Sequence, residues 1–267
     1  MTTAAFAPEY PAALSQPREL RFFAIVATIM ALIVFTAFSV QVSMGRSTFA
    51  SPVRVHVHAI AFMGWVSIFL IQSWFAARGS LAVHRRLGWF AAGWVILMLC
   101  AASWVVIAMT RRGTWPFFFK PQQLLVGDPL MLLCFAGLTW WAVSLRRQTD
   151  WHARLHISAM TALMGPAFGR LIPMPLLVPY AFEISNLLAL MFPVAGMVHD
   201  LRRRGSIHPA WVIGFGTVAI ALLLVDLIAY SLAGDAFYRV VTAGSPGAAV
   251  PGLAYPPPPS GPLLTGR

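Results

Sequence analysis

Apolar runs of about 20 residues recur along this chain and constrain its fold more than any other feature. A helix needs about 20 apolar residues to cross the ~30 Å hydrocarbon core of a bilayer. The runs that meet this length are residues 20–43, 55–77, 88–109, 124–145, 154–173, 177–198 and 210–231. We therefore predict an all-α, polytopic membrane helix bundle of about seven transmembrane helices. Pro166 and Pro173 predict that the fifth run is short, kinked or partly re-entrant.

The composition agrees with a lipid environment and excludes several classes of protein. Of 267 residues, 59% are hydrophobic and 10% are charged, which is too few charged groups to cover a water-soluble domain. The net charge of +11 comes from short Arg clusters between the apolar runs, so it indicates membrane topology and not nucleic acid binding. Lys120 is the only lysine and lies between runs, which excludes a retinal Schiff base inside the bundle. Cys100 and Cys134 lie in apolar runs, so we expect them to be free thiols.

Arg and Lys in the connecting segments predict the orientation, because they are enriched on the cytoplasmic side. With the N-terminus in the cytoplasm, the cytoplasmic segments carry Arg18, Arg21, Arg78, Arg85, Arg86, Arg146, Arg147, Arg154, Arg202, Arg203 and Arg204. The C-terminus is then external. We predict a cytoplasmic leader (1–19), a transmembrane bundle (20–231) and an external Pro/Gly-rich tail (232–267) that is extended or disordered from Ala243 onward.

Histidines gather at the predicted cytoplasmic boundary. His84 precedes the third run, and His152 and His156 lie four residues apart, so they share one face of a helix. Imidazole ligates zinc, copper and heme iron, and these three histidines are therefore candidate metal or heme ligands. The alternative is that histidines and arginines here mark the boundary and contact lipid phosphates.

Polar side chains in the outer third of the predicted spans form a second candidate site. Its members are Arg170, Glu183, Asn186 and Asp226. Because an unpaired charge inside a bilayer is costly, we expect Arg170 to pair with Glu183. The site could line a proton or substrate path, or it could hold helices together by hydrogen bonds. His58 lies at the same depth and is a candidate ligand or proton relay.

Two stretches resemble a family of bacterial polytopic membrane proteins of unassigned function, and together they cover about residues 55–200. The first comprises His58-Ala-Ile-Ala-Phe-Met-Gly, Gln72 and a predicted loop motif, Leu81-Ala-Val-His84-Arg85-Arg86-Leu87-Gly88. The second comprises Trp151-His152-Ala-Arg154-Leu-His156, Gly165-Pro166 and Arg170-Leu-Ile-Pro173. The resemblance implies a multi-pass protein of the bacterial cytoplasmic (inner) membrane.

The layout is also distantly similar to four-helix b-type cytochromes, in which histidines on neighbouring helices hold heme. That similarity implies His58, His84, His152 and His156 as cofactor-binding residues. The outer side has only His56 and His58, both on one helix. At most one bis-His heme is therefore supported, between His84 and either His156 or His152.

Several functions remain open at this point, and no catalytic residue is assigned. The first is a redox protein that carries heme b or a His-ligated metal and exchanges electrons with quinone or a membrane protein partner. The second is a transporter or channel that uses the outer site. The third is a non-catalytic subunit or assembly factor of a membrane complex. A membrane-embedded metal hydrolase that uses His84, His152 and His156 is a fourth.

Overall fold

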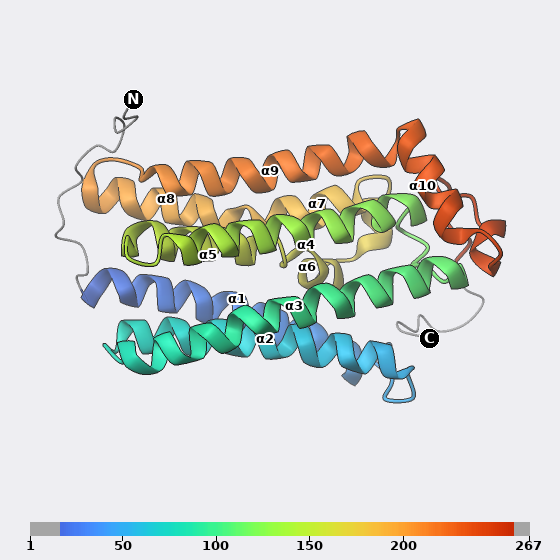
Figure 1. The fold of residues 1–267 in the computed structure, drawn as a ribbon. Helices are drawn as coiled ribbons and strands as arrows, with labels where there is room; N and C mark the ends of the chain where they lie inside the picture. Colours follow the sequence, from blue (N-terminus) through green and yellow to red (C-terminus); the bar gives the residue numbers. More distant parts are fainter. Residues whose placement is uncertain (1–16, 259–267) are drawn as a thin grey trace, which may run out of the picture.

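The computed structural model describes residues 17–258, and over this range it contains helices and loops but no β-strand (Figure 1). The α-helices are α1 (Pro17–Ser43), α2 (Val53–Ala77), α3 (Leu81–Arg112), α4 (Pro121–Ser144), α5 (Thr149–Thr161), α6 (Gly165–Leu171), α7 (Ala181–Ala189), α8 (Met191–Arg204), α9 (Pro209–Ala229) and α10 (Leu232–Thr242). Two short 3₁₀ helices are η1 (Met174–Leu177) and η2 (Pro246–Ala249). The all-α bundle predicted from the sequence is confirmed, whereas most of the predicted leader lies outside the described residues.

Within residues 17–258, six helical segments are long and apolar enough to cross a membrane: α1, α2, α3, α4, α7 joined to α8, and α9. The chain is therefore a multi-pass membrane protein. Helices α5 and α6 together form one more segment between the two ends of the bundle. Arg204 at the end of α8 lies 3.7 Å from Asp150 at the start of α5, so the chain leaves this end along α5–α6 and returns along α7–α8. We call this end, where α1, α5 and α9 begin, the Arg-rich end, and the opposite one the capped end.

The fifth predicted run forms two helices, α5 and α6, with a break between them, as its prolines predicted. Residues 162–164 form a tight turn in which each backbone N–H bonds the carbonyl three residues earlier, at N···O distances of 3.0–3.1 Å. Pro166 cannot supply a backbone N–H to continue the α5 ladder. Gly165 is required at the start of α6, because a Cβ there would collide with the side chain of Asn186 on α7. The break therefore also sets how closely α6 packs on α7.

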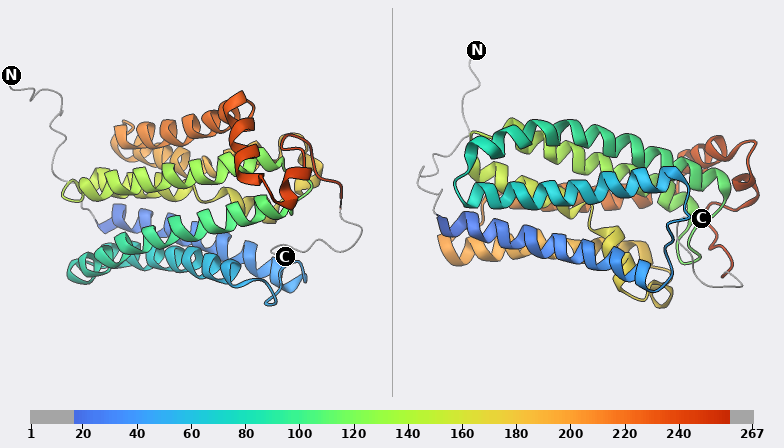
Figure 2. Two further views of the ribbon diagram at one scale, coloured as in Figure 1. Left: turned by 45° about the vertical axis from the view of Figure 1, so that its right-hand side comes forward. Right: turned by 90° about the horizontal axis from the view of Figure 1, so that it is seen from below.

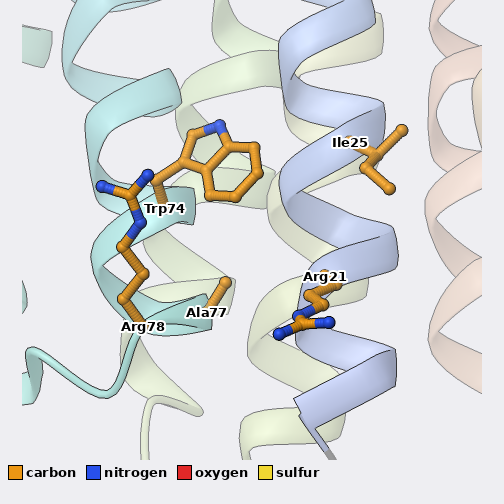
Figure 3. Close-up of a pocket in the computed structure, with 5 residues that line it drawn as sticks. All are labelled: Arg21, Ile25, Trp74, Ala77 and Arg78. Carbon is orange, nitrogen blue, oxygen red and sulfur yellow. The ribbon is translucent and has the colours of Figure 1, made fainter.

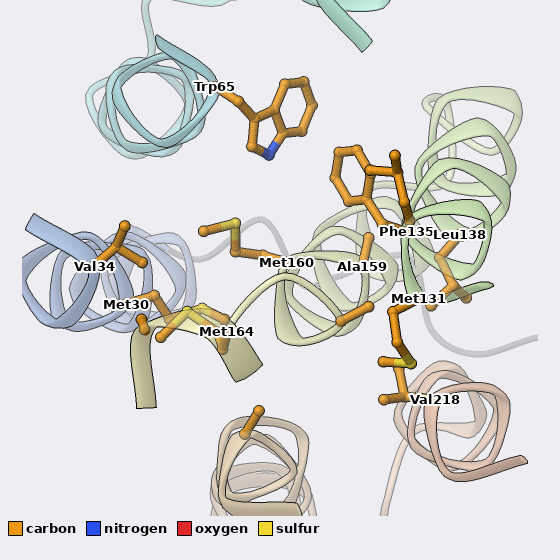
Figure 4. Close-up of a cluster of buried hydrophobic side chains, with 14 of the residues drawn as sticks. Met30, Val34, Trp65, Met131, Phe135, Leu138, Ala159, Met160, Met164 and Val218 are labelled. Atoms are coloured by element: carbon orange, nitrogen blue, oxygen red, sulfur yellow. The ribbon is translucent and has the colours of Figure 1, made fainter. Parts of the chain in front are cut away.

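The core of the bundle surrounds α5. Buried side chains from neighbouring helices lie around α5, which contributes Met160, and they include Met30 of α1, Phe135 of α4 and Val218 of α9 (Figure 4). Two further views show α1, α2 and α3 side by side (Figure 2). Large apolar side chains such as Leu223 of α9 are exposed on the outside of the bundle, where lipid would cover them.

The His-Arg-Arg-Leu-Gly motif is helical and not a loop, which corrects the sequence-based assignment. Helix α3 begins at Leu81, so His84 lies in its first turn. With 32 residues, α3 extends for roughly 48 Å at 1.5 Å per residue, which is longer than the hydrocarbon core. The motif therefore extends α3 beyond the apolar run at the Arg-rich end.

The C-terminal segment packs over the capped end at least to Gly252, which differs from the extended tail that we predicted. Tyr238 of α10 is buried, and its hydroxyl donates a hydrogen bond to the carbonyl of Val250 at 3.0 Å. The backbone N–H of Gln122 at the start of α4 donates to the carbonyl of Gly252 at 2.8 Å. Gly247 lies so close to the carbonyl of Thr110 that a Cβ would collide with it. Small residues thus allow this segment to pack closely, and Pro259 and the residues after it lie outside the described range.

Candidate functional site

His84, His152 and His156 lie together at the Arg-rich end, as the sequence predicted. The ring centroids of His84 and His152 are 6.1 Å apart with their planes at 80°, and those of His152 and His156 are 4.6 Å apart at 85°. His84 comes from α3 and the other two from α5, so the cluster joins helices that are far apart in sequence. We call these three residues the histidine cluster.

Two members of the histidine cluster are oriented by backbone carbonyls. The Nδ1 of His84 lies 3.2 Å from the carbonyl oxygen of Gln72, and the Nδ1 of His152 lies 2.8 Å from that of Ala142. A carbonyl can only accept a hydrogen bond, so each Nδ1 carries a proton and donates it. In the neutral rings the Nε2 lone pairs remain for a ligand, which is the usual way in which a metal-binding imidazole is held.

The rings of the histidine cluster lie edge to face, His84 against His152 and His152 against His156. Within residues 17–258, no group of three His, Cys, Asp or Glu side chains has the geometry that holds a metal ion. Rotation about the ring torsion, whose energy well is broad for histidine, would be needed to direct the Nε2 atoms at one ligand. The chemistry of the three side chains suits zinc, copper or iron.

His58 lies apart from the histidine cluster. It is on α2, 14 positions before Gln72, which corresponds to roughly 21 Å along a helix. Its ring stacks on Phe62 with centroids 4.3 Å apart. The positive charge of Arg170, near the capped end, interacts with the His58 ring. His58 therefore cannot share a ligand with His84.

A buried ion network that the sequence did not reveal lies beside the histidine cluster. Arg154 of α5 is fully buried, and its Nε and Nη2 donate to the two carboxylate oxygens of Asp200 on α8, at 2.9 and 2.8 Å. Its Nη2 also donates to Glu19 of α1 at 2.6 Å, and its Nη1 donates to the carbonyl of Asp150 at 3.0 Å. Arg204 donates to the same oxygen of Glu19. We call Glu19, Asp150, Arg154, Asp200 and Arg204 the ion network.

The ion network stabilises the bundle at the Arg-rich end by joining α1, α5 and α8. A fully buried guanidinium is tolerated only when its donors are bonded to acceptors, and Arg154 donates from its Nε and from both terminal nitrogens. His152 and Arg154 project from the same helix, two residues apart. The ion network therefore fixes the rotation of α5, and with it the positions of the cluster histidines.

His208 begins α9 and predicts a pH dependence of stability. Its Nδ1 accepts a hydrogen bond from the backbone N–H of Ala210 at 3.1 Å, so the ring must be neutral to cap the helix. Burial, and then the positive charges of Arg154 and Arg204, lower the pKa of His208 to about 4. Since the pKa is lower in the folded state, the neutral ring contributes stability that is complete above the unfolded pKa of about 6.5 and is lost as pH falls toward 4.

Replacing His208 by asparagine should flatten that pH dependence, because asparagine caps a helix but does not titrate. We expect the difference in thermal stability between wild type and His208→Asn to change between pH 6.5 and 4 and to be constant above pH 7. Thermal unfolding in detergent across this range is the measurement. A difference that is independent of pH would contradict the assigned role.

At the capped end, two carboxylates share one amide. The Nε2 of Gln123 on α4 donates to Glu183 of α7 and to Asp226 of α9, at 2.7 Å each. Burial, and then the negative charges of Glu183 and Asp226, raise the pKa of the neighbouring Tyr230 to about 12. We call Glu183 and Asp226, together with Gln123, the carboxylate pair, and it joins α4, α7 and α9.

Arg170 and Asn186 do not join the carboxylate pair, although the sequence placed all four residues in one site. The expected Arg170–Glu183 ion pair is not formed in the described part of the chain. Arg170 instead donates a hydrogen bond to the carbonyl of Pro166 at 2.8 Å, and its guanidinium lies over the ring of Phe38. Arg170 also has an electrostatic interaction with Asp128. Asn186 donates to the carbonyl of Phe182 at 2.9 Å and packs on Gly165.

The main residues that sequence reasoning missed are acids and amides that partner charged groups. They include Glu19, at the last position of the predicted leader, and Gln123, directly before the fourth predicted run. One signal was available: the chain has 8 acidic against 19 basic residues, so each acid within or beside an apolar run is worth testing as a partner. The sequence did not show which arginine each acid would pair with. Glu19 and Arg154, for example, are 135 residues apart, and only the packing of the helices brings them together.

No protein-family model, no curated protein and no solved structure matches the chain. The geometry of the histidine cluster, the ion network and the carboxylate pair therefore carries the functional argument.

Proposed function

We propose that this protein is a redox protein of the bacterial inner membrane that binds heme b or a transition metal ion at the histidine cluster. One observation carries the proposal: His84, His152 and His156 lie together, and two of them have their Nδ1 hydrogen-bonded to a backbone carbonyl. Imidazoles held in this way present Nε2 as a ligand. With the N-terminus in the cytoplasm, as the distribution of arginines predicts, the Arg-rich end faces the cytoplasm.

The surroundings of the cluster support a binding role. Each of the three rings is partly buried, so a bound group would be shielded from bulk water but still reachable from the Arg-rich end. The ion network fixes α5 from its other side, which keeps His152 and His156 in place without using their nitrogens. Rigid support of this kind is what a ligand site requires.

A bound heme or copper ion would supply one-electron transfer, with its potential set by the imidazole ligands. The protein's own residues hold and orient the rings and limit the access of water. Position near the membrane boundary suits exchange with quinone or with a membrane protein partner. Cofactor binding can be measured without knowing the electron donor or acceptor.

The test is the absorption spectrum of the detergent-purified protein, oxidised and then reduced with dithionite, together with elemental analysis for iron, copper and zinc. We expect either a reduced heme α-band or a stoichiometric metal ion. His84→Ala, His152→Ala and His156→Ala should each remove most of it. His56→Ala is the matched control, because His56 lies near the capped end with its Nε2 on the carbonyl of Phe49, and it should retain the signal.

Thermal unfolding of each variant separates loss of a ligand from loss of the fold. A featureless spectrum and no bound metal in well-folded wild type would overturn the proposal. Equal signal in wild type and in all three cluster variants would do the same, because the cofactor would then be bound elsewhere. Stoichiometric zinc without iron or copper would reject the redox proposal and favour the hydrolytic alternative.

A further inference from the structure

A hollow between α1 and α2 opens at the Arg-rich end. It has a volume of about 600 Å³ and is lined by Arg21 and Ile25 of α1 and by Trp74, Ala77 and Arg78 of α2 (Figure 3). None of these lining residues is acidic, so the hollow carries two positive charges that no lining group balances. Its walls combine apolar and cationic side chains from two helices.

The two arginines are available to a ligand. Neither Arg21 nor Arg78 forms an ion pair within residues 17–258, and both are exposed. The nearby acid Glu19 is engaged by Arg154 and Arg204 in the ion network. The guanidinium of Arg78 lies over the indole of Trp74, 5.2 Å from the ring centroid. Figure 3 shows Arg21 on the facing helix, with its guanidinium directed toward the gap between α1 and α2.

The rear wall of the hollow is held in place. The Nε1 of Trp74 donates to the hydroxyl of Thr28 on α1 at 3.0 Å, which fixes the indole between the two helices. Ile25 is 52% exposed and extends the apolar wall toward the middle of the membrane. A ligand here meets cationic groups at the boundary and an apolar surface below them.

We infer that this hollow binds an anionic phospholipid, with its phosphate between Arg21 and Arg78 and an acyl chain along Ile25. Guanidinium groups bind phosphate oxygens in paired, charge-assisted hydrogen bonds. Basic pockets between transmembrane helices on the cytoplasmic side are suited to anionic headgroups. An amphiphile fits better than free phosphate because the wall below the arginines is apolar. The inference does not depend on the proposed redox function.

The test is native mass spectrometry of the full chain titrated with phosphatidylglycerol, phosphatidylcholine and inorganic phosphate. We expect one phosphatidylglycerol to bind per chain, and at least tenfold weaker binding to Arg21→Gln/Arg78→Gln. The matched control is Arg202→Gln/Arg203→Gln, which removes the same charge from exposed positions at the same end and should weaken binding less than twofold. Arg21→Lys/Arg78→Lys should fall between, because lysine keeps the charge but loses the paired donors.

Equal weakening by the two glutamine double variants would overturn the inference, since it would indicate attraction to net charge alone. Equal affinity for phosphatidylcholine would overturn it as well. If inorganic phosphate binds to the arginines and displaces the lipid, the site recognises the free anion and the lipid assignment is wrong. Thermal unfolding of every variant shows that the comparison is made on folded protein.

Discussion

Replacing Arg154 by methionine should lower the free energy of unfolding by about 3–5 kcal/mol, the cost of breaking a buried ion pair by removing one partner. Arg154 is 0% exposed, and its loss leaves Asp200 and Glu19 buried with fewer donors. Methionine fills a similar length of space, so the effect reports on charge and hydrogen bonding rather than on a cavity. Reversible unfolding in mixed micelles, followed by circular dichroism, measures the change.

The control for Arg154→Met is Arg239→Met. Arg239 pairs with Asp235 at 2.8 Å, but its side chain is 72% exposed, so its loss should cost less than about 1 kcal/mol. Arg154→Met/Asp200→Asn should recover part of the lost stability, because the uncompensated carboxylate is removed while the side chain can still accept from the backbone of His208. Equal costs for Arg154→Met and Arg239→Met would show that the ion network contributes little to stability.

Truncation of Trp211 to alanine is expected to cost about 3–5 kcal/mol, because it removes a fully buried indole and leaves a cavity. Trp211 lies at the start of α9, where its ring covers Gly196 of α8 and stacks near Phe23 of α1, with ring centroids 6.1 Å apart. A Cβ at position 196 would collide with the indole. Gly196→Ala should therefore cost about 1–3 kcal/mol in the wild type through overpacking.

The two substitutions should not be additive, and this distinguishes a steric contact from general weakening. In the Trp211→Ala background, Gly196→Ala should be close to neutral or stabilising, since the methyl group enters the vacated space. A complete double-mutant cycle by unfolding in mixed micelles measures the coupling. Additive effects would contradict the contact, because they would mean that Gly196 and Trp211 act independently.

The long helices could be predicted from the sequence because lipid imposes a simple length rule. The predicted run 210–231 became Pro209–Ala229, and 124–145 became Pro121–Ser144. The rule failed where helices continue outside the apolar region. Arg85 and Arg86 precede the apolar run 88–109 but are good helix formers, so α3 includes them. Pro and Gly in the C-terminal segment suggested an extended chain, whereas they allow it to pack closely over the capped end.

Some contacts of the candidate sites could likewise be predicted from the sequence, and others could not. His152 and His156 share a helix face, so their proximity followed from spacing alone, and His84 joined them from the same membrane boundary. The Arg170–Glu183 pair failed because depth in the membrane does not determine which face of a helix a side chain occupies. Glu183 instead accepts a hydrogen bond from Gln123, which also donates to Asp226. Such choices depend on how the helices pack, which apolar length does not specify.

The placement of α5 at the centre of the bundle has a consequence for how the protein is made. In 13 residues α5 contains Asp150, His152, Arg154 and His156, and it is not among the helices apolar enough to enter a membrane alone. Charged side chains make it costly for a helix to enter a bilayer without partners. Glu19 is synthesised before α5, but Asp200 follows Arg154 by 46 residues. We therefore expect α5 to enter the bilayer against α1 and α4 and to reach its final position only after α8 has been translated.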